Sequence, residues 1–326
     1  MLTKEYGSYF SIELPYGKEY YESNNNQKVA AFDCGRNAIA TTALSINADR
    51  LYIPYYNCET VRDTLKLHNI SLRKYMLDEN LLPKIDNIGD RDWILVVNYF
   101  GMMTESTFQE LIRKFKRVIF DNTQGFFASP VLSDDIFNIY SPRKFFGVSD
   151  GAYVVWNGKK LIRDDYIQDV SWPRSLFLLK SIEVGTNNAY EDNLKSMDEF
   201  GKEIKMMSKL SHRILSSIDY EVIKQKRKSN ILTLHKLLKD ANELEVNLEA
   251  TSNMMIYPFL CKNEKLRRTL LENKIYVSQW WKYLLDIVPE NSVEAYFSKW
   301  LFPLPIDQRY SEEDMYFIAS VILENI

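Results

Sequence analysis

The chain has 326 residues, of which 46% are hydrophobic and 26% are charged, and this length favours two lobes over one. Its formal net charge of -3 gives no electrostatic reason to expect nucleic acid or anionic lipid as a partner. Three cysteines without Cys-x-x-Cys spacing and three scattered histidines argue against a disulfide framework and against a metal site.

The sequence has the pattern of neither a signal peptide nor a membrane-spanning segment. The N-terminus lacks a charged region followed by an apolar one, as a signal peptide would have. No later stretch approaches the roughly 20 apolar residues of a membrane span. The sequence therefore predicts a cytoplasmic protein with no membrane partner.

The first part of the chain alternates short apolar runs with stretches of helical spacing. Residues 1–28, rich in Tyr, Gly, Asn and Glu, are predicted to be a loop, so that order begins near Lys28. This alternation predicts a mostly parallel sheet between helices, an α/β fold whose ligands bind outside the carboxyl ends of the strands. Strands are predicted at 29–32, 51–54, 72–77, 93–101 and 118–120, and helices at 37–44, 59–68 and 108–115.

After Asp121 the pattern changes to two apolar runs, 136–140 and 152–156, which flank a loop that holds Lys144. Residues 190–218 have helical spacing, with a stripe of Met and Leu on one face that predicts packing. A later strand is predicted at 254–260, and helices at 264–273 and 311–326, the last with Ser311 as N-cap and Asp314 three residues on. We predict two domains, residues 1–215 and 216–326.

Lys144 and Asp121 are the strongest candidates for chemistry. Phe145 and Phe146 follow Lys144 and Arg143 precedes it, which are surroundings that favour the deprotonated amine required of a Schiff-base lysine. Asp121 ends an apolar run and is suited to pair with the nitrogen of a pyridine ring. Taken singly, each has a plainer interpretation, a loop lysine and a turn-capping carboxylate.

Other residues are candidates for binding the same cofactor. Gln124 is placed to reach a ring oxygen, although a loop amide bonded to backbone is the alternative. Gly35 and Arg36 open a helix whose N-H groups suit a phosphate, and Ser141 offers a hydroxyl. Tyr56, in the turn after Pro54, either faces the cofactor or is packed in the core.

The order of these motifs resembles the DegT/DnrJ (StrS-type) family of sugar aminotransferases. The resemblance spans about residues 33–326 and is thinner between 160 and 250. It departs from the family in the shorter Ser141 to Lys144 spacing, in Gly151-Ala152 where paired glycines are usual, and in Asn98 where a histidine is usual. The motifs are Cys34 to Ile39, Ile53 to Cys58, Val97 to Gly101, Asp121 to Gln124, Ser141 to Lys144 with Asp150 to Ala152 behind it, and Leu304 to Asp314.

The resemblance implies a fold type I enzyme that uses pyridoxal 5′-phosphate. The expected fold is a large domain with a mainly parallel seven-stranded sheet and a smaller C-terminal domain. By motif, Lys144 would bind the cofactor covalently, Asp121 would pair with its ring nitrogen and Gln124 would lie near its ring oxygen. Gly35, Arg36 and Ser141 would bind its phosphate, and Asn188, or Asn187 beside it, would reach the phosphate of the partner in a homodimer with shared active sites.

The function implied is transfer of an amino group, with glutamate as the expected donor, to a keto sugar that is nucleotide-linked, in surface polysaccharide or lipopolysaccharide biosynthesis. Two alternatives stay open. One is a non-catalytic member of the same fold that binds a sugar nucleotide, and the other keeps the cofactor but uses it for dehydration. The departures around Lys144 are what leave these alternatives open, whereas the presence of both Lys144 and Asp121 disfavours the non-catalytic one.

Overall fold

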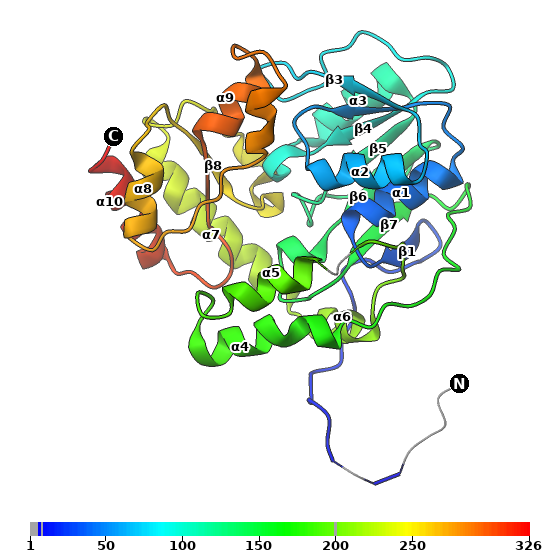
Figure 1. Cartoon of the computed structure of the whole chain (residues 1–326), viewed down its shortest axis with the longest axis horizontal. Helices are drawn as coiled ribbons and strands as arrows, with labels where there is room; N and C mark the ends of the chain where they lie inside the picture. Colours follow the sequence, from blue (N-terminus) through cyan, green and yellow to red (C-terminus); the bar gives the residue numbers. More distant parts are fainter. Residues whose placement is uncertain (1–5, 8, 199–200) are drawn as a thin grey trace.

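Seven strands form one sheet in the computed structural model, which describes residues 6–7, 9–198 and 201–326 (Figure 1). Their order is β1-β7-β6-β5-β4-β2-β3. Strand β7 runs antiparallel to both of its neighbours, and the remaining neighbours pair in parallel. The prediction of a mainly parallel seven-stranded sheet is therefore confirmed. The strands are β1 (Lys28–Phe32), β2 (Leu51–Pro54), β3 (Leu72–Tyr75), β4 (Trp93–Val97), β5 (Val118–Asp121), β6 (Ile136–Tyr140) and β7 (Ala152–Trp156).

Helices cover both faces of this sheet, and the alternation of side chains along a strand supplies a core to each face. In β4, Ile94 and Val96 belong to one hydrophobic cluster, and Trp93 and Leu95 belong to the other. Helix α3 (Glu105–Phe115) packs on the first face, and helices α1 (Gly35–Ser45) and α2 (Glu59–Leu67) pack on the second. Strands β4 to β7 are buried over their whole length, as their continuous apolar sequences predict.

The prediction that residues 190–218 are helical is confirmed at both ends of this range and is wrong between them. Two helices are found instead, α5 (Tyr190–Asp198) and α6 (Lys209–Leu215), and residues 199–200 lie outside the described ranges. Between the helices the chain is extended beside β1, where Asp33 N-H donates to Lys205 O and Met207 N-H donates to Ala31 O. The outer edge of β1 needs hydrogen-bond partners, and this need outweighs the helical spacing of the sequence. Helix α4 (Leu176–Val184) precedes this region, after a 3-10 turn, η3 (Trp172–Ser175).

A second, two-stranded sheet organises the C-terminal lobe, where β8 and β9 pair antiparallel. Helices α7, α8 and α10 pack on it around a separate hydrophobic cluster. The predicted last helix is confirmed, since Ser311 caps it and Asp314 completes a capping box. The elements of this lobe are α7 (Tyr220–Leu238), β8 (Tyr257–Leu260), α8 (Leu266–Glu272), α9 (Val293–Trp300), β9 (Leu301–Leu304) and α10 (Glu312–Leu323).

Order begins earlier than the predicted Lys28. Tyr21 is buried, and its hydroxyl donates to Phe126 O at 2.5 Å. Its ring stacks on Tyr140, so an aromatic cluster that polar neighbours concealed in the sequence fixes this segment to the sheet. Within the described part of the chain, no helix is both long enough and apolar enough to cross a membrane.

Candidate active site

Most of the candidate residues lie where the parallel strands end. Asp121 is the last residue of β5, and Lys144 closes the 3-10 turn η2 (Pro142–Lys144), which directly follows Ser141 at the end of β6. Gly35 begins α1 just after β1. Because β5 and β6 pair in parallel, their carboxyl ends lie at the same edge of the sheet. Asp121 and Lys144 are 23 positions apart in the sequence, and the connection from β5 to the parallel neighbour β6 brings them to the same edge of the sheet.

The Lys144 side chain is exposed and lies between two cavities. Its Nζ donates a hydrogen bond to Thr123 Oγ1 at 2.9 Å. The side chain is accessible to solvent because it borders two cavities, and Arg143, Asp121 and Cys58 are close enough to its amine to influence its pKa. Desolvation lowers the pKa of Lys144, Arg143 lowers it further, and Asp121 and Cys58 oppose the shift. The net direction favours the neutral, nucleophilic amine.

The Asp121 carboxylate is held by the turn that follows it. Its Oδ1 accepts the backbone N-H of Thr123 at 3.0 Å, and the side chain is buried. Beside it, Asn98 Nδ2 donates to Asn122 Oδ1 at 2.9 Å, which links the ends of β4 and β5. A fixed buried carboxylate at this position is suited to hold a protonated heterocyclic nitrogen.

The turn that follows β4, the strand next to β5, orients the Gln124 side chain. Its Oε1 accepts the backbone N-H of Phe100 at 2.9 Å, and the residue lines one of the two cavities at Lys144. The turn needs Gly101, which has a φ of +83° and where a Cβ would lie 2.7 Å from Gln124 O and 2.5 Å from Asn253 O. The glycine therefore permits the close approach of two chain segments that fixes Gln124.

The start of α1 lies directly against this group of residues. A Cβ added at Gly35 would lie 3.1 Å from Thr123 Cγ2, so the backbone at the helix N-terminus passes close to the residue that binds Lys144. Arg36 Nε donates to Gly201 O at 3.5 Å. Ser141 is buried at the end of β6. The three residues that the sequence assigned to a phosphate thus lie at ends of neighbouring elements, with helix N-H groups among them.

Tyr56 and Asn188 lie away from this group. The Tyr56 ring packs in the core against Trp281 at 4.4 Å and Tyr99 at 5.4 Å between centroids. Its buried hydroxyl has no hydrogen-bond partner within the described ranges. Asn188 is exposed in the turn between α4 and α5, where its Nδ2 donates to Val184 O at 2.8 Å.

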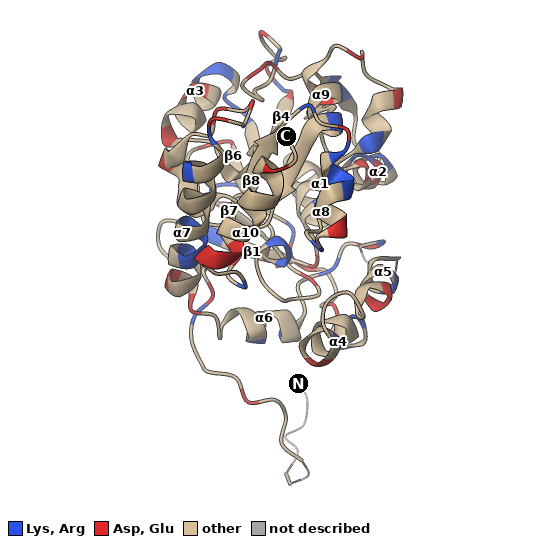
Figure 2. Ribbon diagram, turned by 90° about the vertical axis from the view of Figure 1, so that its left-hand side faces the viewer, with Lys and Arg blue, Asp and Glu red and all other residues tan. Residues whose placement is uncertain are grey.

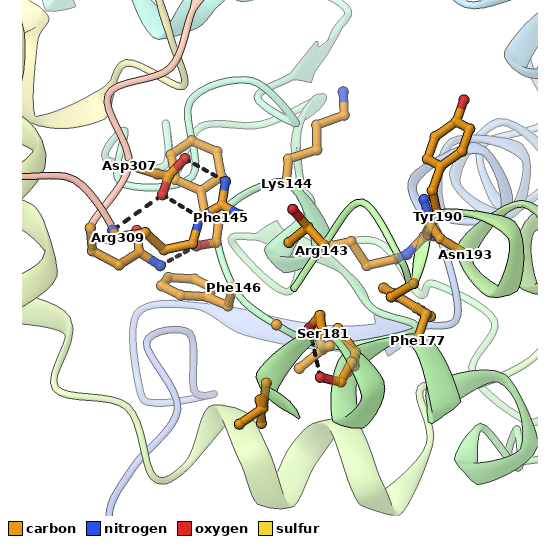
Figure 3. A pocket seen from close by; sticks show the side chains of 17 residues that line it. Arg143, Lys144, Phe145, Phe146, Phe177, Ser181, Tyr190, Asn193, Asp307 and Arg309 are labelled. Carbon is orange, nitrogen blue, oxygen red and sulfur yellow. Dashed lines mark hydrogen bonds and ion pairs between the residues drawn. The ribbon is translucent and has the colours of Figure 1, made fainter. Parts of the chain in front are cut away.

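Two cavities meet at Lys144. The larger, of about 620 Å³, lies between the Lys144 loop, α4 with α5, and the segment 307–309 (Figure 3). The smaller, of about 470 Å³, has Gln124 and Lys144 on the sheet side. Its opposite wall comes from the C-terminal lobe and is largely aromatic and apolar, with Met255, Ile256, Tyr276, Trp280, Trp281, Pro303 and Pro305. Asp307 borders both cavities.

Several residues of this site could not be identified from the sequence. Thr123 lies in the Asp121 to Gln124 motif, but its contact with Lys144 depends on the fold and not on the local sequence. Trp280 and Trp281 are more than 130 residues from Lys144 in the sequence, and no local pattern marked them. Asp307 follows the Leu304-Pro305 turn, which was the available signal that this segment belongs near the site.

The fold agrees with that of solved structures of sugar aminotransferases. A DegT/DnrJ/EryC1/StrS aminotransferase from Brucella abortus is 14% identical, covers 91% of this chain and 85% of its own, and gives a TM-score of 0.62. PseC of Helicobacter pylori, an aminotransferase involved in pseudoaminic acid biosynthesis, is 14% identical to this chain. The match covers 96% of this chain and 99% of PseC, with a TM-score of 0.59. The pyridoxal phosphate form of Spr1654 from Streptococcus pneumoniae, a sugar aminotransferase, is 13% identical to this chain. The match covers 92% of this chain and 88% of Spr1654, with a TM-score of 0.62.

No protein-family model and no curated protein sequence matches the chain. At these identities the structural likeness establishes the fold. The chain has fold type I, and the resemblance to the DegT/DnrJ family that its motifs carry is confirmed at the level of architecture.

Proposed function

From the premise that the chain shares the fold of the sugar aminotransferases, we propose that it is itself an aminotransferase dependent on pyridoxal 5′-phosphate. It would transfer an amino group, with glutamate as donor, to a keto sugar that is nucleotide-linked. The observation that carries this proposal is the position of Lys144, whose lowered pKa favours a neutral amine, at the same sheet edge as the buried carboxylate of Asp121.

The residues present fit the cofactor. Lys144 would hold it covalently through Nζ, and Asp121 would hold its protonated ring nitrogen. Gln124 would lie by its ring oxygen, and Ser141 and Arg36 would bind its phosphate with the N-H groups that begin at Gly35. The absence of a side chain at Gly35 lets the start of α1 lie close to the turn that carries Thr123, which brings helix N-H groups near Lys144, the bonding partner of Thr123.

The chain's own groups supply proton transfer. The bound cofactor would provide an electron sink for the charge that forms on a substrate carbon when it loses a proton. Lys144, once displaced by the amino substrate, would take that proton at Nζ and return it to the carbon being aminated. Desolvation makes the neutral base available at lower pH than for a free lysine. Thr123 Oγ1, 2.9 Å from Nζ, would direct the amine when the lysine is free.

The smaller cavity supports a sugar substrate. A wall with Trp280, Trp281 and Tyr276 opposite Lys144 offers apolar ring faces, and such faces suit the C-H surface of a sugar ring. Gln124 and Asp307 place polar groups at its edges. We further propose that the protein acts in the cytoplasm in surface polysaccharide or lipopolysaccharide biosynthesis, with residues 1–215 and 216–326 as its two domains.

We also propose a homodimer with shared active sites. The exposed turn that carries Asn188 supports a role for this residue in the partner's phosphate site, since its side chain is not buried in its own protomer. Tyr56, packed in the core, would support the cofactor site through Trp281, which lines the smaller cavity.

The proposal is tested by spectroscopy and by product analysis. Protein purified with pyridoxal phosphate should show the visible absorbance of a lysine-bound cofactor. Lys144→Ala should abolish it, and the matched control Lys228→Ala, at an exposed position of α7, should retain it. With glutamate and a panel of nucleotide-linked keto sugars, wild type should release 2-oxoglutarate. Absence of the band in wild type would refute the cofactor assignment, and a band without 2-oxoglutarate would favour dehydration.

A further inference from the structure

Helix α4 is an apolar helix without a core to bury it. Six of its residues are apolar, Leu176, Phe177, Leu178, Leu179, Ile182 and Val184. None of its nine residues, all of which the structure describes, is buried. Ile182 is 82% exposed although it lines the larger cavity at Lys144. An unburied apolar helix of this kind marks an interaction surface.

The surface continues onto the neighbouring elements. Trp172 in η3 and Leu194 and Met197 in α5 are also exposed. One charged pair bridges the two helices of this surface, since Lys180 of α4 pairs with Asp192 of α5 at 2.7 Å. We call this surface the α4–α5 face, and define it by Trp172, Leu176, Leu179, Ile182, Leu194 and Met197. Its composition suits an apolar partner.

The chain itself carries a segment with matching chemistry. Residues 9–16, here called the N-terminal arm, are extended and present large apolar side chains to solvent, with Phe10 94% exposed. The exposed side chains are Tyr9, Phe10, Ile12 and Tyr16. Each is costly to leave in water, and the arm runs away from the body of its own protomer rather than along it (Figure 1).

The root of the arm is fixed on helix α6. Arg213 donates through Nη1 to Pro15 O at 2.8 Å and through Nη2 to Leu14 O. Its guanidinium also lies over the Tyr16 ring, 4.1 Å from the centroid. At Gly17 the chain passes so close to α6 that a Cβ would lie 2.7 Å from Ser216 O. The arm therefore leaves the body in a defined place and direction.

The arm and the α4–α5 face lie at the same end of the molecule. In Figures 1 and 2, α4, α5 and α6 are grouped at this end and the arm leaves beside them. Hydrogen bonds tie the elements together, since Ser171, just before η3, bonds to Ser208, the N-cap of α6, at 2.6 Å. A two-fold axis at this end would bring each arm onto the other protomer's face, because an isologous contact requires donor and acceptor on one side.

We propose that the N-terminal arm docks on the α4–α5 face of a second copy of this chain, and that the exchange is reciprocal. The partner's arm would cover Leu179 and Ile182. Because Ile182 also lines the larger cavity beside Lys144, the exchanged arm would close that cavity from outside. The contact therefore gives the second copy a direct part in forming the space around Lys144, and it goes beyond a general expectation of dimerisation.

The test is the strength of dimerisation in point variants. Sedimentation of full-length wild type should show a dimer. Phe10→Asp and Leu179→Asp should each raise its dissociation constant at least tenfold, because each buries a charge in the contact. Leu271→Asp changes a leucine of similar exposure on α8, away from this end of the molecule, and should leave the constant unchanged. Circular dichroism would verify that each variant is folded.

A cross-link identifies the contact directly. Copies with Phe10→Cys mixed with differently tagged copies with Leu179→Cys should form a disulfide between the two chains, and neither variant alone should form it with wild type. A monomeric wild type, a dimer that Phe10→Asp leaves intact, or the lack of the mixed disulfide would overturn the proposal. The absorbance of lysine-bound pyridoxal phosphate reports separately on the proposed cofactor and activity, so that the arm contact and the cofactor assignment can fail independently.

Discussion

Gln308 donates a hydrogen bond from Nε2 to the backbone oxygen of Phe145 at 2.8 Å, and so joins the C-terminal lobe to the residue that follows Lys144. Arg227 Nη1 donates in turn to Gln308 Oε1 at 3.2 Å. The Arg227 guanidinium also lies 4.5 Å from the centroid of the Phe145 ring. The lysine loop is thus held in place from a different lobe, through residues far from it in sequence.

Replacing Gln308 should loosen this loop. In Gln308→Ala the Phe145 carbonyl and the Arg227 guanidinium each lose a partner in a largely buried region, which should cost about 1–3 kcal/mol of unfolding free energy. We also expect a shifted or weakened absorbance of lysine-bound cofactor, because Lys144 adjoins Phe145. Denaturant unfolding and visible spectra measure the two effects.

The matched control for this variant is Gln279→Ala. Gln279 Nε2 donates to Ser298 O at 2.9 Å, which is the same kind of bond in the same lobe but without contact to the lysine loop. It should affect stability alone. Equal spectra for both variants would show that Gln308 does not position Lys144.

Asp121→Asn should remove the negative charge at the end of β5 while it keeps the local structure. The amide oxygen can still accept the Thr123 N-H, so stability should change little. Loss of the negative charge should lower kcat by about 100-fold or more, as for removal of other preorganised electrostatic groups at reaction centres. Steady-state kinetics with an active keto sugar would decide this, and activity near that of wild type would contradict the assigned role.

Gly101→Ala should be among the more harmful small substitutions. The φ of +83° strains any other residue, at a cost of about 1–3 kcal/mol, and a Cβ 2.5 Å from Asn253 O adds a clash with backbone. Gly147→Ala, where the Cβ would meet Leu178 Cδ2 at an ordinary 3.9 Å, should be tolerated. Thermal unfolding of the pair measures the difference, and similar melting temperatures would count against the observed turn.

His212 should make stability depend on pH. Burial lowers the pKa of the imidazole, but the hydrogen bond from Nδ1 to Glu19 and the charge of Glu19 outweigh it, so that the net shift is upward from 6.5. Since protonation is favoured in the folded state, the added stability is fully present below pH 6.5 and is lost as pH rises through the raised pKa.

The measurement for this prediction compares wild type with His212→Gln. The difference in unfolding free energy between them should shrink as pH increases from acidic to alkaline values, because only wild type loses a favourable charge. A difference that stays constant or grows with pH would contradict the Glu19 pairing.

Local pattern predicted those parts of the fold that depend on short stretches of sequence. Asp121 and Lys144 could be proposed as partners because apolar runs end just before them, and strand ends of a parallel sheet share one edge. Ser311 and Asp314 could be predicted as a capping box because that motif is complete within four residues. In both cases the physical cause lies beside the residue itself.

The rest depended on contacts between distant segments. Residues 205–207 have the spacing of a helix, but pairing with β1 makes them extended. Tyr21 lies among polar neighbours, yet it is buried on Tyr140. Trp281 reaches Tyr56 across 225 positions, and no periodicity in the chain encodes that contact. Tertiary packing overrides local preference at these places.

The complete burial of β4 to β7 affects how fast different positions of the sequence can diverge in evolution. A strand buried on both faces accepts many combinations of apolar residues, whereas the few side chains at its carboxyl end have no substitutes for their chemistry. Mutations can therefore accumulate through most of the sequence while the strand tips stay recognisable. We therefore expect Asp121, Gln124 and Lys144 to change more slowly than the rest of a chain that is 14% identical to a solved structure of the same fold.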